Sequence, residues 1–213
     1  MTSRDMTWKT GDAGDRRVRS KPLTRVLWGL KIATVSLGLA AGALGAYCGA
    51  IIYTGNVHAV TEGVFYRSAQ LGKANLEAVA RQHGIKSVLN LRGAHPGEAW
   101  YDDEIDASRT LGLAHYDYAL SAKRFVSGPQ ITQLLDIVRN APKPLLVHCK
   151  SGADRAGLVS ALYRYAIAGV SAAEADRQLS LAYGHFPYLT SRSGAMDDSF
   201  WAYVDASGRR QEK

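Results

Sequence analysis

The chain has 213 residues, of which 46% are hydrophobic and 21% are charged, and its formal net charge is +7. That length suits one ordinary domain together with an appendage. Two cysteines are too few for a disulfide scaffold or for a four-cysteine zinc site, so both classes are excluded. The basic balance would suit a nucleic-acid-binding protein, so the position of the charge along the chain matters.

Most of the excess positive charge lies in residues 1–31. This segment holds eight basic and three acidic side chains, a net of +5, whereas residues 54–213 carry a net of only +2. The segment lacks hydrophobic periodicity and contains Gly11, Gly14 and Pro22, so we expect a mostly disordered basic tail. The rest of the chain has no basic helix and no basic strand studded with aromatic residues, which argues against nucleic acid as a partner.

Residues 32–53 form an apolar stretch without a charged residue, IATVSLGLAAGALGAYCGAIIY. A helix of this length spans about 33 Å at roughly 1.5 Å per residue, enough for a bilayer core of about 30 Å. The alternatives are a cleaved signal peptide, whose apolar region is usually shorter, and a buried helix of a soluble domain. The length and the basic flank favour a transmembrane anchor, which makes the membrane a partner through residues 32–53.

The flanks of this stretch predict its orientation. Eight basic residues precede it, whereas only Arg67 and Lys73 lie in the following twenty or so residues. The positive-inside rule then places the tail in the cytoplasm, and in a bacterium it places residues 54–213 on the periplasmic side of the inner membrane. Four glycines share one helical face and would allow two such helices to pack as a homodimer, although glycine is common in membrane helices anyway: Gly38, Gly42, Gly45 and Gly49.

Residues 54–213 alternate between short apolar runs and helical patterns. Strands are expected at 64–67, 87–91, 115–120 and 144–148, and the last of these is nearly all apolar, as in a buried parallel strand. Helical spacing marks 76–83, 98–110, 131–138, 158–166 and 195–206, and Ser171 with Glu174 opens one more helix as a capping box. The alternation predicts one α/β domain with a mainly parallel central sheet flanked by helices.

The segment HCKSGADRAG, residues 148–157, connects the most apolar strand to the following helix. A tight loop at a helix N-terminus gathers unpaired amides and the positive end of the helix dipole, which together bind a tetrahedral anion. The same field favours a nucleophilic thiolate at Cys149, and Arg155 is placed to grip two phosphoryl oxygens. Gly152 and Gly157 permit the tight turn and a close approach of helix to strand. A cysteine six residues before an arginine arises often by chance, but this combination is hard to explain as packing alone.

The pattern H-C-x5-R-x-G resembles the signature loop of the cysteine-dependent protein tyrosine phosphatase superfamily, and most of all its bacterial dual-specificity-type branch. The resemblance covers roughly residues 60–185. It includes the weaker segments FYRSAQ at 65–70, VLNLRG at 88–93 and YGH at 183–185.

The resemblance implies a two-step reaction without a metal ion or other cofactor. Cys149 attacks phosphorus and forms a phosphocysteine, a general acid protonates the leaving oxygen, and water cleaves the intermediate. Arg155 and the loop stabilise the equatorial oxygens. The substrate-binding positions that the resemblance implies are His148, Lys150, Ser151, Gly152 and Ala153.

Two positions depart from the family pattern. Ala156 stands where the family usually has serine or threonine, which predicts slower breakdown of the phosphocysteine. The loop at 119–125, where most relatives carry the acid, has no carboxylate. The candidates for the acid are therefore Asp154, inside the signature loop as in myotubularin-type phosphatases, and Asp117 upstream. Alternatively, Asp154 is a residue that caps the N-terminus of the helix and has no catalytic role.

The leading hypothesis is a membrane-anchored phosphomonoester hydrolase that acts on a phosphorylated protein or on a phosphorylated lipid headgroup. A non-catalytic phosphate-binding module and a sulfur transferase remain as alternatives. Arg67 and Arg92 are read as phosphate ligands or salt-bridge partners, and His185 as a packing or capping residue. An acidic run is expected to be a solvated helix face: Asp102, Asp103, Glu104 and Asp106.

Overall fold

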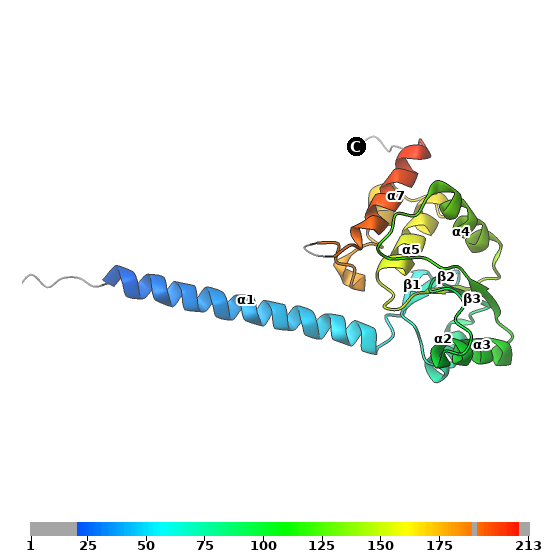
Figure 1. The fold of residues 1–213 in the computed structure, drawn as a ribbon, viewed down its shortest axis with the longest axis horizontal. Coiled ribbons are helices and arrows are strands. Elements are labelled where there is room, and N and C mark those ends of the chain that lie inside the picture. The colour runs from blue at the N-terminus through cyan, green and yellow to red at the C-terminus, as the bar shows by residue number, and fades with distance from the viewer. Residues whose placement is uncertain (1–20, 189–190, 209–213) are drawn as a thin grey trace, which may run out of the picture. The chain divides into compact units, whose positions relative to one another are not determined.

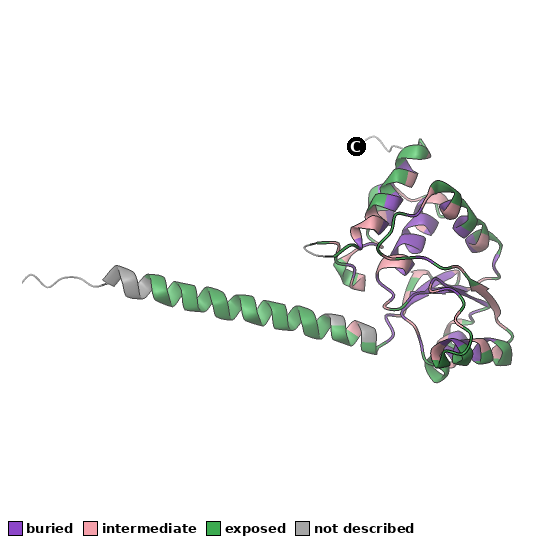
Figure 2. Cartoon of the chain, in the orientation of Figure 1, coloured by how far each residue is buried: buried purple, intermediate pink, exposed green. Residues whose placement is uncertain are grey.

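The computed structural model describes residues 21–188 and 191–208, and the chain divides into two compact units, Met1–Gly45 and Ala46–Lys213 (Figure 1). Helix α1, Lys21–Tyr53, starts within the segment that was expected to be tail, and residues 1–20 of that tail lie outside the described residues. Its stretch Val26–Ile51 is long and apolar enough to cross a membrane, by length and composition. The side chains from Val26 to Tyr47 are exposed (Figure 2).

The second unit is built on a five-stranded sheet in the order β1-β2-β5-β3-β4. Strands β2, β5, β3 and β4 run parallel, and β1 pairs antiparallel with β2 at one edge. The mainly parallel sheet is confirmed, although the sequence did not predict β1. The strand bounds are His58–Thr61 for β1, Phe65–Ser68 for β2, Ser87–Asn90 for β3, Ala114–Asp117 for β4 and Leu145–His148 for β5.

Helices cover both faces of this sheet, as Figure 1 shows, with α2 and α3 on one face and α4, α5 and α7 on the other. The alternation of side chains along each strand divides the core accordingly. In β5, Leu145 and Val147 pack into the core under α4, α5 and α7, whereas Leu146 joins the core under α2 and α3. The bounds are Lys73–His83 for α2, Ala99–Leu111 for α3, Gly128–Asn140 for α4, Asp154–Ala166 for α5, Ala172–Asp176 for α6 and Gly194–Ala206 for α7, with a 3₁₀ turn at Leu181–Tyr183.

The helix ends follow from short-range chemistry that the sequence displays. Gly84 and Gly112 adopt left-handed conformations and terminate α2 and α3, as expected of glycine after a helix. The Ser171 hydroxyl accepts the amide of Glu174 at 3.1 Å and opens α6, which confirms the predicted N-terminus of that helix. Helix α5 begins at Asp154, inside the HCKSGADRAG segment, and the loop before it therefore lies at the N-terminus of a helix.

Candidate active site

The 148–155 loop leaves the carboxyl end of β5 and enters the first turn of α5. Because β5 lies between β2 and β3, two parallel neighbours end beside this loop. His148 pairs in register with Ser68 on one side and with Asn90 on the other. Cys149 follows directly and is 1% exposed. The central strand thus delivers the cysteine to the carboxyl edge of the sheet, where open α/β folds bind their ligands.

Groups from outside the loop hold its backbone carbonyl oxygens. These bonds are Leu91 N to His148 O at 2.9 Å, Gln70 N to Lys150 O at 3.3 Å, Asn56 Nδ2 to Ser151 O at 2.9 Å, and Arg67 Nη2 to Gly152 O at 2.7 Å and to Ala153 O at 2.9 Å. The amides of residues 150–155, by contrast, donate to no other group within the described residues. A run of free amide donors therefore follows Cys149, which is the arrangement that binds an anion.

Gly152 gives the loop its turn. Its φ is +73°, in the left-handed region, and Ala153 follows in the right-handed helical region with φ −87° and ψ −73°. Successive residues of opposite hand direct their amides into one concavity. A Cβ atom at position 152 would lie 2.7 Å from the backbone of both Ser68 and Ala69, so only glycine fits there.

The guanidinium of Arg155 has one edge occupied and one edge available. Nη1 donates to Leu91 O at 3.2 Å and to Leu120 O at 3.3 Å. The buried Nε has no hydrogen-bond partner in the part of the chain that the structure describes. Two carbonyls thus fix the plane of the group, and its Nε edge remains for a bidentate bond to an anion.

Arg67 supports the loop from behind. Its side chain is 0% exposed, although arginine is rarely buried, and burial lowers its pKa to about 10. Nη1 donates to the backbone and side-chain oxygens of Gln178 at 2.7 and 3.0 Å, while Nη2 holds the two loop carbonyls given above. Arg67 was expected to be a phosphate ligand or a salt-bridge partner. The structure shows neither role, because its guanidinium donates to backbone and amide oxygens and organises the loop backbone.

Glu104 is buried behind His148, so the expectation that it lies on a solvated helix face is wrong. Its Oε1 accepts from His115 Nε2 at 2.7 Å and from His148 Nε2 at 3.1 Å, and its Oε2 accepts from Gln70 Nε2 at 2.5 Å. Burial alone would raise the pKa of Glu104, but the hydrogen bonds from His115 and His148 lower it to about 2. Glu104 shares the buried face of α3 with Tyr101, three residues before it, a helical spacing visible in the sequence.

The lowered pKa of Glu104 makes the stability of the fold depend on pH. Because the ordinary value is 4.5, the contribution of this carboxylate is complete above pH 4.5 and is lost as the pH falls towards 2. We expect the stability advantage of the wild type over Glu104→Gln to shrink by about 2 kcal/mol between pH 7 and pH 3. Urea unfolding at both pH values measures this. The control is Glu77→Gln on α2, where the carboxylate is half-buried and has one exposed arginine partner, Arg81; an unchanged difference for Glu104→Gln would contradict the expectation.

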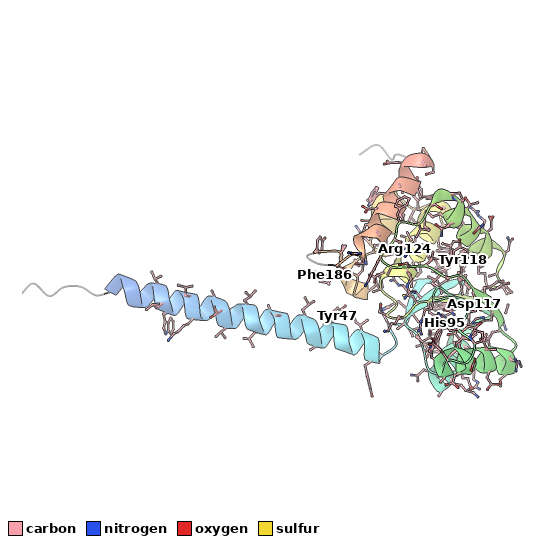
Figure 3. All side chains as sticks on the ribbon, viewed as in Figure 1. Tyr47, His95, Asp117, Tyr118, Arg124 and Phe186 are labelled. Carbon is pink, nitrogen blue, oxygen red and sulfur yellow. The ribbon has the colours of Figure 1, made fainter. Side chains whose placement is uncertain are left out.

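Asp117, labelled in Figure 3, ends β4 and accepts hydrogen bonds from two other elements of the fold. Its Oδ1 accepts from Asn90 Nδ2 at 2.8 Å, and its Oδ2 accepts from the Tyr101 hydroxyl at 2.6 Å. Burial and this hydrogen bond raise the pKa of Tyr101 to about 12. Because both carboxylate oxygens of Asp117 tie β4 to neighbouring elements, this residue is the poorer of the two candidates for a proton donor.

Asp154 lies at the other side of the loop, in the first turn of α5. Its Oδ1 is 2.7 Å from His185 Nδ1, and no side-chain cap bond is made at the start of this helix. The His185 ring is fully buried, and its Nε2 is 2.9 Å from Asp197 Oδ2 on α7. Burial would lower the pKa of His185, but the two carboxylates raise it to about 9. His185 therefore bridges two acidic groups, a role that its sequence context does not predict.

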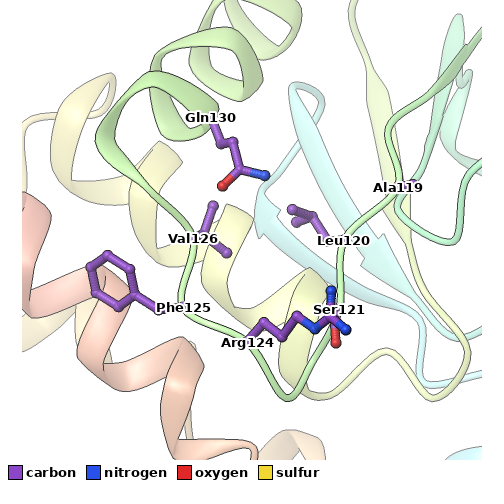
Figure 4. Close-up of a pocket in the computed structure, with 7 residues that line it drawn as sticks. All are labelled: Ala119, Leu120, Ser121, Arg124, Phe125, Val126 and Gln130. Carbon is purple, nitrogen blue, oxygen red and sulfur yellow. The ribbon is translucent and has the colours of Figure 1, made fainter.

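Two cavities lie against the residues that contact this loop. A cavity of about 500 Å³ is lined by the segment before α4, including Leu120, whose carbonyl accepts from Arg155, and by Gln130 (Figure 4). A second, of about 320 Å³, is lined by Asp154 together with Ala122, Lys123, Ser191, Arg192 and Ser193. Within residues 21–188 and 191–208, no group of three or more His, Cys, Asp or Glu side chains is placed to hold a metal ion.

Known proteins match this chain by sequence family and by fold. Solved structures of the same fold include TpbA from P. aeruginosa, with 20% identity and a TM-score of 0.51 over 71% of this chain and 92% of that one. The core catalytic domain of the PP-IP phosphatase SIW14 from S. cerevisiae has 21% identity and a TM-score of 0.51 over 74% and 96%. A comparison with curated proteins found no match. The model of the tyrosine phosphatase family matches residues 48–178, more than half of the sequence, so the chain belongs to this family and is a cysteine-dependent phosphatase.

Proposed function

We propose that the chain hydrolyses phosphomonoesters through a phosphocysteine intermediate on Cys149. The observation that carries the proposal is the 148–155 loop, whose carbonyls are held from outside while the amides of 150–155 remain free beside Cys149. These amides, contributed by Lys150, Ser151, Gly152, Ala153 and their neighbours, would donate hydrogen bonds to the phosphoryl oxygens, and the Nε edge of Arg155 would complete the cradle.

The first step joins the Cys149 sulfur to phosphorus while the bond from phosphorus to the ester oxygen breaks. The charge that shifts onto the equatorial oxygens meets donors that are already fixed in place, so little reorganisation is required. His148, the last residue of β5, contributes through its hydrogen bond to Glu104. This bond fixes the end of the strand and therefore the position of Cys149, the next residue. We assign Asp154 as the acid that gives a proton to the leaving oxygen, because this residue lines a cavity at the loop.

In the second step a water attacks the phosphocysteine and the thiolate leaves. Ala156, which is fully buried in the first turn of α5, offers no hydroxyl to the departing sulfur. When hydrolysis of the intermediate limits turnover, Ala156→Ser is therefore expected to raise the steady-state rate about tenfold, the equivalent of one hydrogen bond to a charged group.

Rapid-mixing measurement of the burst and of the steady-state rate tests this expectation. Ala161→Ser, the same change at another fully buried position of α5, is the control and should leave the rate unaltered. A steady-state rate that Ala156→Ser does not raise would contradict the proposed role of this position.

The substrate that we propose is a phosphorylated protein, because the chain belongs to the tyrosine phosphatase family and a TpbA variant of the same fold has been solved in complex with pTyr. One observation favours a phosphorylated lipid or inositol headgroup as the second candidate. The cavity at Asp154 is lined by Lys123 and Arg192, which would attract a substrate with a further anionic group.

We further propose that α1 anchors the chain in a bilayer, as a bacterial inner-membrane protein with the phosphatase unit on the periplasmic side. The apolar stretch Val26–Ile51 and the basic residues before it support this topology. Protease protection in intact spheroplasts tests the orientation. The glycine face of the helix, including Gly42 and Gly45, would serve a homodimer.

Phosphate release by the full chain in detergent tests the proposed function. The substrates are phosphotyrosine and phosphoserine peptides, phosphatidylglycerophosphate and phosphoinositides, with Cys149→Ser as the control. We expect release well above the control on at least one of them, and the preferred substrate decides between protein and headgroup. No release above the control on any substrate would overturn the enzymatic assignment.

A further inference from the structure

His185 occupies a position that links the catalytic loop to the last helix. It follows the 3₁₀ turn at Leu181–Tyr183, and its ring is fully buried between α5 and α7. Nδ1 lies 2.7 Å from Asp154 Oδ1 and Nε2 lies 2.9 Å from Asp197 Oδ2. Both ring nitrogens therefore face carboxyl oxygens, and a ring that is protonated at both nitrogens donates to each of them.

The surroundings of His185 keep it in the imidazolium form. The charged groups that act on it are Asp154 on α5, Asp197 on α7 and, at longer range, Asp176 on α6. All three are acidic, and the pKa of His185 is raised to about 9. At neutral pH the ring thus holds two N–H donors in fixed directions, one towards the catalytic loop and one towards α7.

Asp154 needs such a partner because of its place in the helix. An aspartate in the first turn has free helix amides within reach, and its carboxylate readily turns back to accept from them. The Nδ1–H of His185 competes with those amides and holds Oδ1 on the side of the buried ring. Asp197 in turn fixes the ring, since it accepts from the opposite nitrogen.

We propose that His185, clamped by Asp197, is the positioning residue that directs the Asp154 carboxyl towards the leaving-group oxygen. This inference rests on the proposed function, in which Asp154 is the acid. As the bond from phosphorus to the ester oxygen breaks, Asp154 gives the proton on its Oδ2 to that oxygen and becomes a carboxylate. Before this transfer, Asp197 alone balances the imidazolium charge, and Oδ1 of the neutral acid accepts from Nδ1–H. The carboxylate stays bonded to Nδ1–H and takes a proton from the attacking water in the second step, while His185 keeps its own protons throughout.

Two substitutions of His185 separate positioning from packing. The amide nitrogen of asparagine comes close to the place of Nδ1, so His185→Asn keeps a donor for Asp154. The longer glutamine places its amide nitrogen near Nε2, so His185→Gln keeps a donor for Asp197 but leaves Asp154 unheld. Both variants bury one amide in the same site, and each is thereby the control for the other.

The readout is the dependence of kcat on the leaving group, measured with the full chain in detergent. For His185→Gln we expect kcat on phenyl phosphate, a poor leaving group, to fall about 10²-fold, the contribution of one positioned acid. On p-nitrophenyl phosphate, whose leaving group departs without a proton, kcat should stay within about threefold of the wild type. His185→Asn should retain most of the activity on both substrates, and KM should change little in either variant.

Equal losses in the two variants on both substrates, or an unaltered leaving-group dependence in a folded His185→Gln, would overturn the positioning role. If the wild type releases no phosphate even from p-nitrophenyl phosphate, the proposed function itself fails, which is a different result.

If His185→Gln does not fold, a magnetic-resonance measurement that leaves His185 unchanged still tests the proposal. The imidazole N–H resonances of the wild type should shift when vanadate, an analogue of the phosphoryl transition state, binds. The same addition to Asp154→Asn should leave them in place. Wild-type resonances that do not respond to bound vanadate would equally overturn the role of His185.

Discussion

Replacement of Cys149 by serine is expected to lower phosphate release by roughly 10⁴–10⁶-fold, the scale of losing a nucleophile. A serine hydroxyl has almost no anionic form near neutral pH and is a far weaker nucleophile than a cysteine sulfur. Binding should survive, because the amides of residues 150–155 and Arg155 are unchanged. The measurement pairs initial rates with the affinity for a phosphorylated ligand, determined by calorimetry.

The chain contains its own matched control for this substitution. Cys48 is the other cysteine of the sequence, and Cys48→Ser makes the same chemical change within α1. That variant should keep the wild-type rate on soluble substrates. Retention of turnover by Cys149→Ser, or equal losses in the two variants, would contradict the assignment of Cys149 as the nucleophile.

Replacement of Arg67 by glutamine should lower the free energy of unfolding by about 3–4 kcal/mol and also remove most of the activity. Arg67 makes four hydrogen bonds in a fully buried position, two to Gln178 and two to the carbonyls of Gly152 and Ala153. Glutamine is too short to reach both partners, so buried carbonyls would be left without donors, and the loop would lose the support that turns its amides inward.

Urea unfolding and kcat/KM together test this expectation. Arg81→Gln is the control, because Arg81 forms only an exposed pair with Glu77 on α2, and its removal should cost no more than about 0.5 kcal/mol. A wild-type unfolding curve for Arg67→Gln, or an activity loss without any loss of stability, would show that Arg67 does not support the loop as described.

Local patterns were sufficient to predict most of the fold. The apolar run at 144–148 predicted β5, glycines predicted the ends of α2 and α3, and the HCKSGADRAG segment predicted a loop at the N-terminus of a helix. Strand β1 was missed because its four residues, His58–Thr61, show no alternation, and it pairs only at the edge of the sheet.

The partners of the site residues could not be predicted in the same way. Asn56 and Arg67 meet the loop, and Gln178 meets Arg67, across long sequence separations, and nothing in their immediate sequence marks these contacts. Glu104 was expected on a solvated face, although it lies three residues after Tyr101, a helical spacing that could have indicated that the two residues share the buried face of α3. A buried acid is rare unless it is paired, and the two histidines that pair with Glu104, His115 and His148, lie on other elements, so the local sequence alone favours a solvated charge.

The hydrogen bonds to the carbonyls of the 148–155 loop also determine how the protein unfolds. Apart from the helical bond from Gly157 N to Ala153 O, the donors to those carbonyls belong to other segments: Asn56 before β1, Arg67 in β2, Gln70 after β2 and Leu91 after β3. No small part of the chain can therefore form the anion cradle alone, and it exists only while β2, β5 and β3 are assembled. Catalytic competence and global folding should thus be lost in one cooperative transition, so an assay of activity against denaturant would report the integrity of the whole sheet.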